Sequence, residues 1–208
     1  MGGTVDVLKG DRRNSTVLHQ VCAHGKSIET VLTLIMLGAD INAKDKTLNA
    51  TPLMLACRYG KWFAVEPLLA NGADANAFDT TNRTALMYAC MALKNMIPVP
   101  GKVVQLLVNR MTSEAINRRD SIGVGEGNSA LHSAAKNYLD NEILEILVKA
   151  GAQKDLRNDL RQAAFDCLPY EKYSHPDFME KKKILQTFKV VSITNVNAAY
   201  NFKSYFKF

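Results

Sequence analysis

The chain has 208 residues, of which 47% are hydrophobic, and its formal net charge at pH 7 is +6. That length is enough to form one sizeable core, and no stretch approaches the roughly 20 apolar residues of a membrane-spanning helix. The first residues have neither a charged start nor an apolar run, so we expect no secretory signal.

The positive charge is concentrated near the C-terminus. Residues 171–208 hold seven lysines and three acidic residues, which accounts for +4 of the total. The first 170 residues are therefore almost balanced. Because a repeat protein that binds nucleic acid carries a basic stripe along its repeats, we do not expect nucleic acid as the partner.

The chain opens with a short lead, residues 1–10, in which Val5, Val7 and Leu8 predict a half-turn of helix over the end of the following fold. The first helical pair is expected over residues 16–23 and 28–36. Apolar residues recur at helical spacing in the second of these helices, which predicts that all of them lie in the core: Ile28, Val31, Leu32, Leu34 and Ile35.

The next helical pair is the clearest in the chain. Thr51 can cap a helix, and Pro52 in the first turn removes no helical hydrogen bond. Gly60 ends this short apolar helix, and Gly72 ends the one that follows. Two helices with so little apolar surface need neighbours of the same kind in order to fold.

Such neighbours are present. The same helix start recurs at Thr16, Thr51, Thr84, Ser129 and Ala163, at spacings of 35, 33, 45 and 34 residues. A Gly-Ala-Asp sequence at 38–40 and 72–74 recurs as Gly-Ala-Gln at 151–153. A period near 33 with helix starts of the Thr-Pro-Leu-His-x-Ala kind is typical of ankyrin repeats. Residues 11–168 therefore resemble the ankyrin repeat family.

The resemblance implies an all-α ankyrin-repeat solenoid, with helix-turn-helix repeats joined by hairpin loops. We expect about four repeats plus a partial C-terminal cap. The later helices are expected over 84–93 and 103–108 in the third repeat, and over 129–136 and 142–149 in the fourth. Insertions interrupt both repeats, at 96–101 between the helices and at 123–126 in the hairpin. The last unit begins near 158 and is cut short by Pro169.

A tail rich in lysine and aromatic residues follows, over 169–208. Residues 177–188 predict an amphipathic helix with Lys181, Lys182 and Lys183 directed outward, and residues 190–194 have strand character. The tail matches no pattern that assigns it a role. It folds back on the last repeat, contributes to a partner interface, or begins a further domain.

The four cysteines predict packing and not chemistry. Cys22, Cys57 and Cys90 take one equivalent position of the first helix, and Cys167 lies close to it. Free cysteine acts there as a small hydrophobe, which suits a reducing compartment. The spacing fits no zinc or redox motif, although thiols of neighbouring repeats could approach one another, which leaves metal or redox chemistry as the alternative.

The histidines point the same way. His19 and His132 stand at the histidine position of the family motif, where the resemblance implies a hydrogen bond to the turn of the next repeat. The glycine-rich loop at 123–129 precedes a helix, but it lacks the lysine of a phosphate-binding loop. We therefore expect no catalytic residue, no metal site and no cofactor.

By resemblance, binding takes place at the hairpin tips and on the concave face of the first helices. Carried over residue by residue, this predicts a set of residues that we name the binding strip: Arg12, Arg13, His24, Lys46, Thr47, Arg58, Tyr59, Thr80, Arg83, Met91, Ser121, Ile122, Lys136 and Asn137. Its first half is basic, and Tyr59 and Met91 are apolar anchors near its centre. Tyrosine and arginine are frequent at interface hot spots, so we expect a protein or peptide partner with acidic residues around an apolar centre.

The expected function is non-catalytic protein binding by an adaptor, an inhibitor or a targeting subunit. We expect a monomer in the cytoplasm; a nuclear location or delivery into a host cell stays open. The alternative is a targeting fragment of a larger enzyme or host-directed effector, whose catalytic domain lies outside this sequence. A third reading, in which the basic tail binds an anionic surface, predicts binding that weakens with salt.

Overall fold

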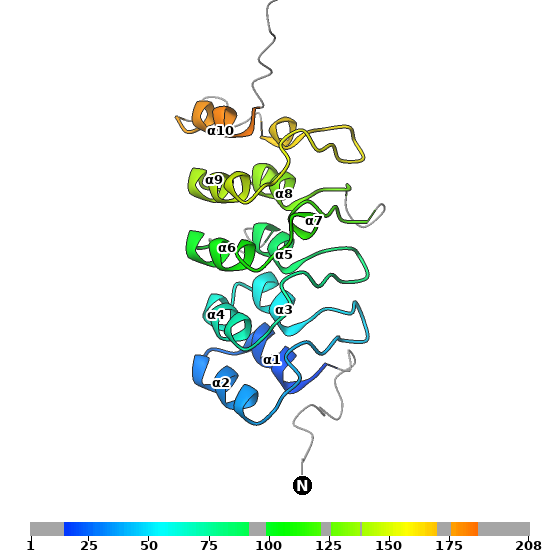
Figure 1. The fold of residues 1–208 in the computed structure, drawn as a ribbon, viewed down its shortest axis with the longest axis vertical. Coiled ribbons are helices and arrows are strands. Elements are labelled where there is room, and N and C mark those ends of the chain that lie inside the picture. Colours follow the sequence, from blue (N-terminus) through cyan, green and yellow to red (C-terminus); the bar gives the residue numbers. More distant parts are fainter. Residues whose placement is uncertain (1–14, 92–98, 122–125, 138, 170–175, 187–208) are drawn as a thin grey trace, which may run out of the picture.

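The computed structural model describes residues 15–91, 99–121, 126–137, 139–169 and 176–186. These residues form a stack of short helices in two columns (Figure 1). The first helices of the repeats form one column: α1 (Val17–His24), α3 (Pro52–Arg58), α5 (Ala85–Met91) and α8 (Ala130–Lys136). The second helices form the other: α2 (Ile28–Met36), α4 (Trp62–Ala70), α6 (Gly101–Val108) and α9 (Asn141–Lys149).

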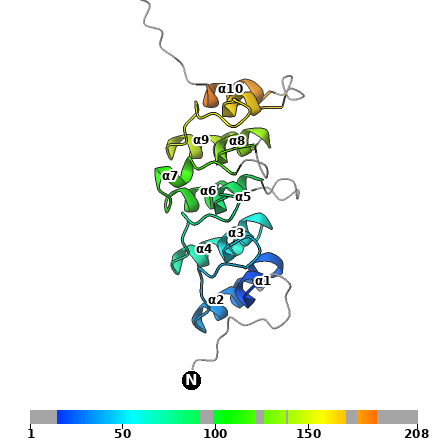
Figure 2. The same cartoon turned by 90° about the vertical axis from the view of Figure 1, so that its right-hand side faces the viewer.

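Each helix packs on its counterpart in the next repeat, so α1, α3, α5 and α8 contact one another in sequence, as do α2, α4, α6 and α9. Viewed from the side, the repeats follow one another along one axis (Figure 2). A 3-10 helix, Ala164–Cys167, and the helix α10 (Phe178–Leu185) close the far end. The expected all-α ankyrin architecture is confirmed for the described residues.

The helix ends form as the sequence predicts. The hydroxyl of Thr51 accepts a hydrogen bond from the backbone of Met54 at 3.4 Å, and Pro52 occupies the first turn. Gly38, Gly72 and Gly151 follow the second helices with φ between 82° and 94°. Only glycine adopts that conformation without steric cost, which explains why the Gly-Ala landmark recurs.

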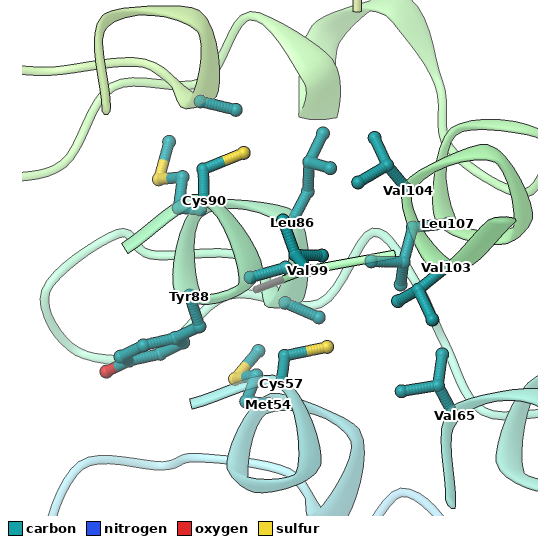
Figure 3. Packing of buried hydrophobic residues seen from close by; sticks show 14 of the residues in the cluster. Met54, Cys57, Val65, Leu86, Tyr88, Cys90, Val99, Val103, Val104 and Leu107 are labelled. Carbon is teal, nitrogen blue, oxygen red and sulfur yellow. The ribbon is translucent and has the colours of Figure 1, made fainter. Parts of the chain in front are cut away.

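The core runs between the two columns. Figure 3 shows Leu86 and Cys90 of α5 above Cys57 of α3, with Val104 and Leu107 of α6 beside them. All five side chains are fully buried. Each repeat therefore buries its apolar face on the next one, which is how short helices of this kind become stable.

The cysteines confirm their predicted packing role. Cys22, Cys57 and Cys90 are buried and free, and Cys167 is free and half-buried. Burial raises the pKa of Cys22 and of Cys90 to about 12. These thiols are therefore protonated at neutral pH and behave as apolar groups.

The histidines link neighbouring repeats, as expected. The Nδ1 atom of His19 lies 2.8 Å from the Thr16 hydroxyl, and its Nε2 lies 3.0 Å from the carbonyl oxygen of Ala50 in the next hairpin. His132 repeats this arrangement, with Nε2 lying 3.0 Å from the carbonyl oxygen of Gln162. Because a carbonyl oxygen only accepts, Nε2 carries the proton in both rings.

Two expectations about burial are wrong. Ile28 and Leu32 are each 39% exposed, not buried in the core, because α2 packs only on α1 and α4 among the described helices, which leaves its outer face uncovered by them. Met36 follows on the same helix at 87% exposure. Lys181, expected to face outward, is 2% exposed, and its Nζ donates to the Asn141 side chain at 2.8 Å.

The other comparisons with the sequence-based expectations concern which helices and strands form. A short helix, α7 (Ser113–Ile116), lies in the connection after α6, where no helix was expected. The tail helix α10 lies within the predicted range 177–188. The lead at 1–10, the strand expected at 190–194, and residues 96–98 and 123–125 of the two insertions lie outside the described residues.

Candidate functional site

The described members of the binding strip come from two kinds of element. His24, Arg58, Tyr59, Met91, Lys136 and Asn137 lie at or just after the ends of the first helices. Lys46, Thr47, Thr80, Arg83 and Ser121 lie in the hairpin loops, which project from one side of the stack (Figure 1). Arg12, Arg13 and Ile122 lie outside the described residues, and the binding role of the whole strip stays a prediction.

Arg58 stands at the centre of an aromatic cluster. The carbon at the centre of its guanidinium group lies 5.7 Å from the ring centroid of Tyr59 and 5.6 Å from that of Tyr88. The ring of His24 in turn lies 5.5 Å from the ring of Tyr59. A cation over aromatic rings within about 6 Å is attracted to their faces. The cluster therefore joins α1, α3 and α5 across three repeats.

Tyr88 is the anchor of this cluster, and the sequence reasoning missed it. Its hydroxyl donates to the Asp79 carboxylate at 2.6 Å. Burial and that hydrogen bond raise the pKa of Tyr88 to about 12, so the phenol stays neutral. A signal was available, because the equivalent positions in the other repeats hold Gln20, Leu55 and Ser133.

The hairpins are held by carboxylates in their own turns. Asp45 accepts from the backbone of Leu48 and Ala50, and Asp79 accepts from the backbone of Thr81 and Arg83. Successive hairpins are also hydrogen bonded to one another, since the amide of Thr80 donates to the Leu48 carbonyl at 2.8 Å. Lys46, Thr47 and Thr80 are exposed on this fixed frame.

Three further strip residues use their side chains for polar contacts within the fold. The Arg83 guanidinium donates to the Asp120 carboxylate at 3.2 Å, and these side chains are only 15% and 6% exposed. The Asn137 amide donates to the Cys90 carbonyl oxygen at 2.9 Å. Lys136 pairs with Glu126 at 2.7 Å. Arg83 and Asn137 therefore tie repeats together, a role that their sequence positions did not indicate.

The described residues contain no cluster of three or more His, Cys, Asp or Glu side chains that could hold a metal ion. Within the same residues, no helix combines the length and the apolar character needed to cross a bilayer.

The comparisons with known proteins agree with this architecture. A family model for ankyrin repeats in three copies matches residues 18–109, and an ankyrin repeat model matches residues 126–159. Together they cover more than half of the chain, which therefore belongs to the ankyrin repeat family.

Several curated proteins are similar to this chain. A putative ankyrin repeat protein of Rickettsia felis is 28% identical over 134 residues, covering 61% of this chain and 54% of the relative. A putative ankyrin repeat protein of fowlpox virus is 30% identical over 200 residues, covering 90% and 42%. An E3 ubiquitin-protein ligase of Arabidopsis thaliana is 31% identical over 138 residues, covering 59% and 26%. The chain thus spans about half, or less, of the length of these relatives.

Proposed function

We propose that this chain binds a protein partner on the binding strip, as an adaptor, an inhibitor or a targeting subunit. Ankyrin repeats are generally modules of protein–protein interaction and generally non-catalytic. The partner carries acidic residues around an apolar centre. The observation that supports this most directly is the half-buried Arg58, whose guanidinium carbon lies 5.7 Å from the ring centroid of Tyr59 and 5.6 Å from that of Tyr88.

The physical reason lies in how the arginine is held. Aromatic rings beside an arginine limit the conformational freedom of its side chain, so less of that freedom is lost when a partner binds. Tyr59 and Met91 are half-buried members of the same strip, so they offer apolar surface. Lys46 adds positive charge on the neighbouring hairpin, which favours encounter with an acidic partner.

The test is capture of partners from a lysate followed by titration of the purified partner. Arg58→Glu with Tyr59→Ala is compared with the wild type and with a control, Lys149→Glu with Met36→Ala, at exposed residues of the second helices. The proposal expects at least about tenfold weaker binding for the first variant and wild-type binding for the control. Equal binding by all three proteins, with circular dichroism showing that all are folded, would refute the assignment.

A second candidate function follows from the length of the relatives. The chain covers 26% of the Arabidopsis thaliana ligase and 42% of the fowlpox virus protein, so similar repeats occur within longer proteins. This favours the alternative in which these repeats are the targeting part of a larger enzyme or effector. Sequencing of the full transcript beyond the codon for Phe208 distinguishes the two.

We also propose that the chain acts as a monomer in the cytoplasm. The buried, free thiols of Cys22, Cys57 and Cys90 support a reducing compartment, where disulfides are rare. Cell fractionation and sedimentation of the purified chain test these two proposals separately.

A further inference from the structure

An open hollow of about 520 Å³ lies at the end of the stack that α10 closes (Figure 1). Its lining comes from the last hairpin, from the 3-10 helix with Ala163 before it, and from the end of α10. No described residue of the binding strip belongs to this lining, so the hollow is separate from the proposed binding surface.

The lining of the hollow suits an uncharged, apolar side chain. Ala163, Phe165 and Leu185 give it an apolar wall. Its charged residues are two cations and two anions, Lys154, Arg157, Asp155 and Asp166. Their charges cancel, so the hollow favours neither an anion nor a cation, whereas burial of its apolar wall would be favourable.

The polar groups of the hollow are already hydrogen bonded or exposed to solvent. The Arg157 guanidinium donates to the Arg161 carbonyl at 2.6 Å, and the Asp166 carboxylate accepts from the Ala163 amide at 2.9 Å. Asp155 is exposed. Phe165 and Ala163, in contrast, are only half-buried, so apolar surface is what the hollow leaves to be covered.

The chain itself leads to the rim of this hollow. Helix α10 ends at the buried Leu185, and Gln186 follows in an extended conformation with φ −71° and ψ 129°. Both residues line the hollow, and Gln186 is the last residue that the structure describes. The Lys154 ammonium donates to the Gln186 carbonyl at 3.4 Å, which holds this point of the chain on the last hairpin.

Phe188 is the first apolar residue after Gln186, two positions along the sequence, and its neighbours Thr187 and Lys189 are polar. Two residues of chain span up to about 7 Å, so the ring of Phe188 can reach the hollow from its rim. A cavity of roughly 150 Å³ accommodates a benzene molecule. The hollow, at about 520 Å³, therefore has room for a phenyl ring.

We propose that Phe188 occupies this hollow and packs on Phe165 and Ala163, so that the start of the tail caps the last unit of the stack. The occupant is a segment of this chain and not a partner. A terminal unit needs such a cap, because no further repeat covers its apolar surface. The cap does not depend on any partner of the binding strip.

The experiment records nuclear Overhauser spectra of the full chain, with isotope labels on the alanine methyl groups and the phenylalanine rings. The proposal expects a cross-peak between the Ala163 methyl group and the Phe188 ring, which lie far apart in the sequence. This cross-peak should vanish in Phe188→Ala and persist in Phe202→Ala, a matched control farther along the same tail.

Thermal unfolding gives a second measurement. Phe188→Ala should lower the unfolding temperature by about 3–6 °C, because it removes a buried aromatic side chain. Phe202→Ala should change it by no more than about 1 °C. Phe165→Ala combined with Phe188→Ala should cost less than the sum of the two single losses, since each variant already removes the contact between these rings.

Four results would overturn the inference. If no aromatic cross-peak to Ala163 depends on the tail, the hollow is open. If the cross-peak persists in Phe188→Ala, another residue fills it. If the cross-peak also forms in a mixture of chains that each carry only one of the two labels, the occupant belongs to a second copy. If Phe188→Ala unfolds at the same temperature as Phe202→Ala, the ring is not buried.

Discussion

The equivalent cysteines allow a sharp test of how the repeats pack. Cys57 is 0% exposed in α3, and burial raises the pKa of its thiol well above the ordinary value. The fourth repeat holds Ala135 at the same position, also 0% exposed. The site therefore accepts a small apolar side chain, and we predict that Cys57→Ala is tolerated better than Cys57→Ser, although serine has nearly the shape of cysteine.

The magnitudes follow from burial. Cys57→Ala removes one buried heavy atom and should lower the free energy of unfolding by about 1 kcal/mol, as for the deletion of a methyl group. Cys57→Ser places a hydroxyl in an apolar site and should lower it by about 2–3 kcal/mol. For a chain of this length, each kcal/mol corresponds to about 2–4 °C in the unfolding temperature.

The assay is urea denaturation followed by circular dichroism, with both variants and the wild type at one pH under reducing conditions. The slope of free energy against urea should stay constant, because the surface exposed on unfolding does not change. If the Cys57→Ser variant is as stable as the Cys57→Ala variant, or more stable, this cysteine does not act as a buried hydrophobe. Leu160→Ala, at a 59% exposed hairpin residue, is the control and should change stability by no more than about 0.5 kcal/mol.

Three more predictions follow from named side chains. Cys167 is half-buried, and burial raises its pKa to about 11, so a thiol reagent should modify it first in the folded chain and faster as the pH rises towards 11. Cys22 is buried and should react only when the chain unfolds, and mass spectrometry of the modified protein measures both reactions. Burial lowers the pKa of His132 below its ordinary 6.5, so the unfolded chain takes up the proton first and stability falls as the pH drops below about 6.5. Denaturation at pH 7.5 and pH 5 should show a smaller loss in His132→Gln than in the wild type, and an equal loss would contradict the assignment. Lys181→Met should leave the free energy of unfolding unchanged or raise it by about 1 kcal/mol, because burial lowers the pKa of this lysine and methionine fills the same space without a charge. Thermal unfolding measures this change, and a marked loss would show that the contact with Asn141 stabilises α10.

The repeat architecture was predictable because it depends on local signals that recur. The caps at Thr51 and Ser129, the proline in the first turn of α3, and the glycines with positive φ each favour a helix boundary by local chemistry alone. Their period then required helices to stack, since single pairs bury too little apolar surface. The links made by His19 and His132 followed from the same motif.

Other side-chain contacts between repeats were decided by the tertiary structure. The sequence placed Arg83 on the binding strip, but the fold brings Asp120 to within 3.2 Å of it and makes the pair a link between hairpins. The sequence assigned no role to Tyr88, whereas the fold places its ring 5.6 Å from the Arg58 guanidinium group and its hydroxyl 2.6 Å from the Asp79 carboxylate. Lys181 was expected on the outward, polar face of an amphipathic helix, and only the packing of α10 on α9 buried it.

The sequence by itself thus determined the repeat, its helix ends and most of its core positions, because these depend on signals within each helical pair. Contacts between side chains of different repeats depend on which faces of neighbouring pairs meet. Arg58 meets Tyr88 from the next repeat, and Arg118 meets Phe78 from the preceding hairpin. Side chains so far apart along the chain come within contact distance only when the repeats stack, so only the tertiary structure could show them together.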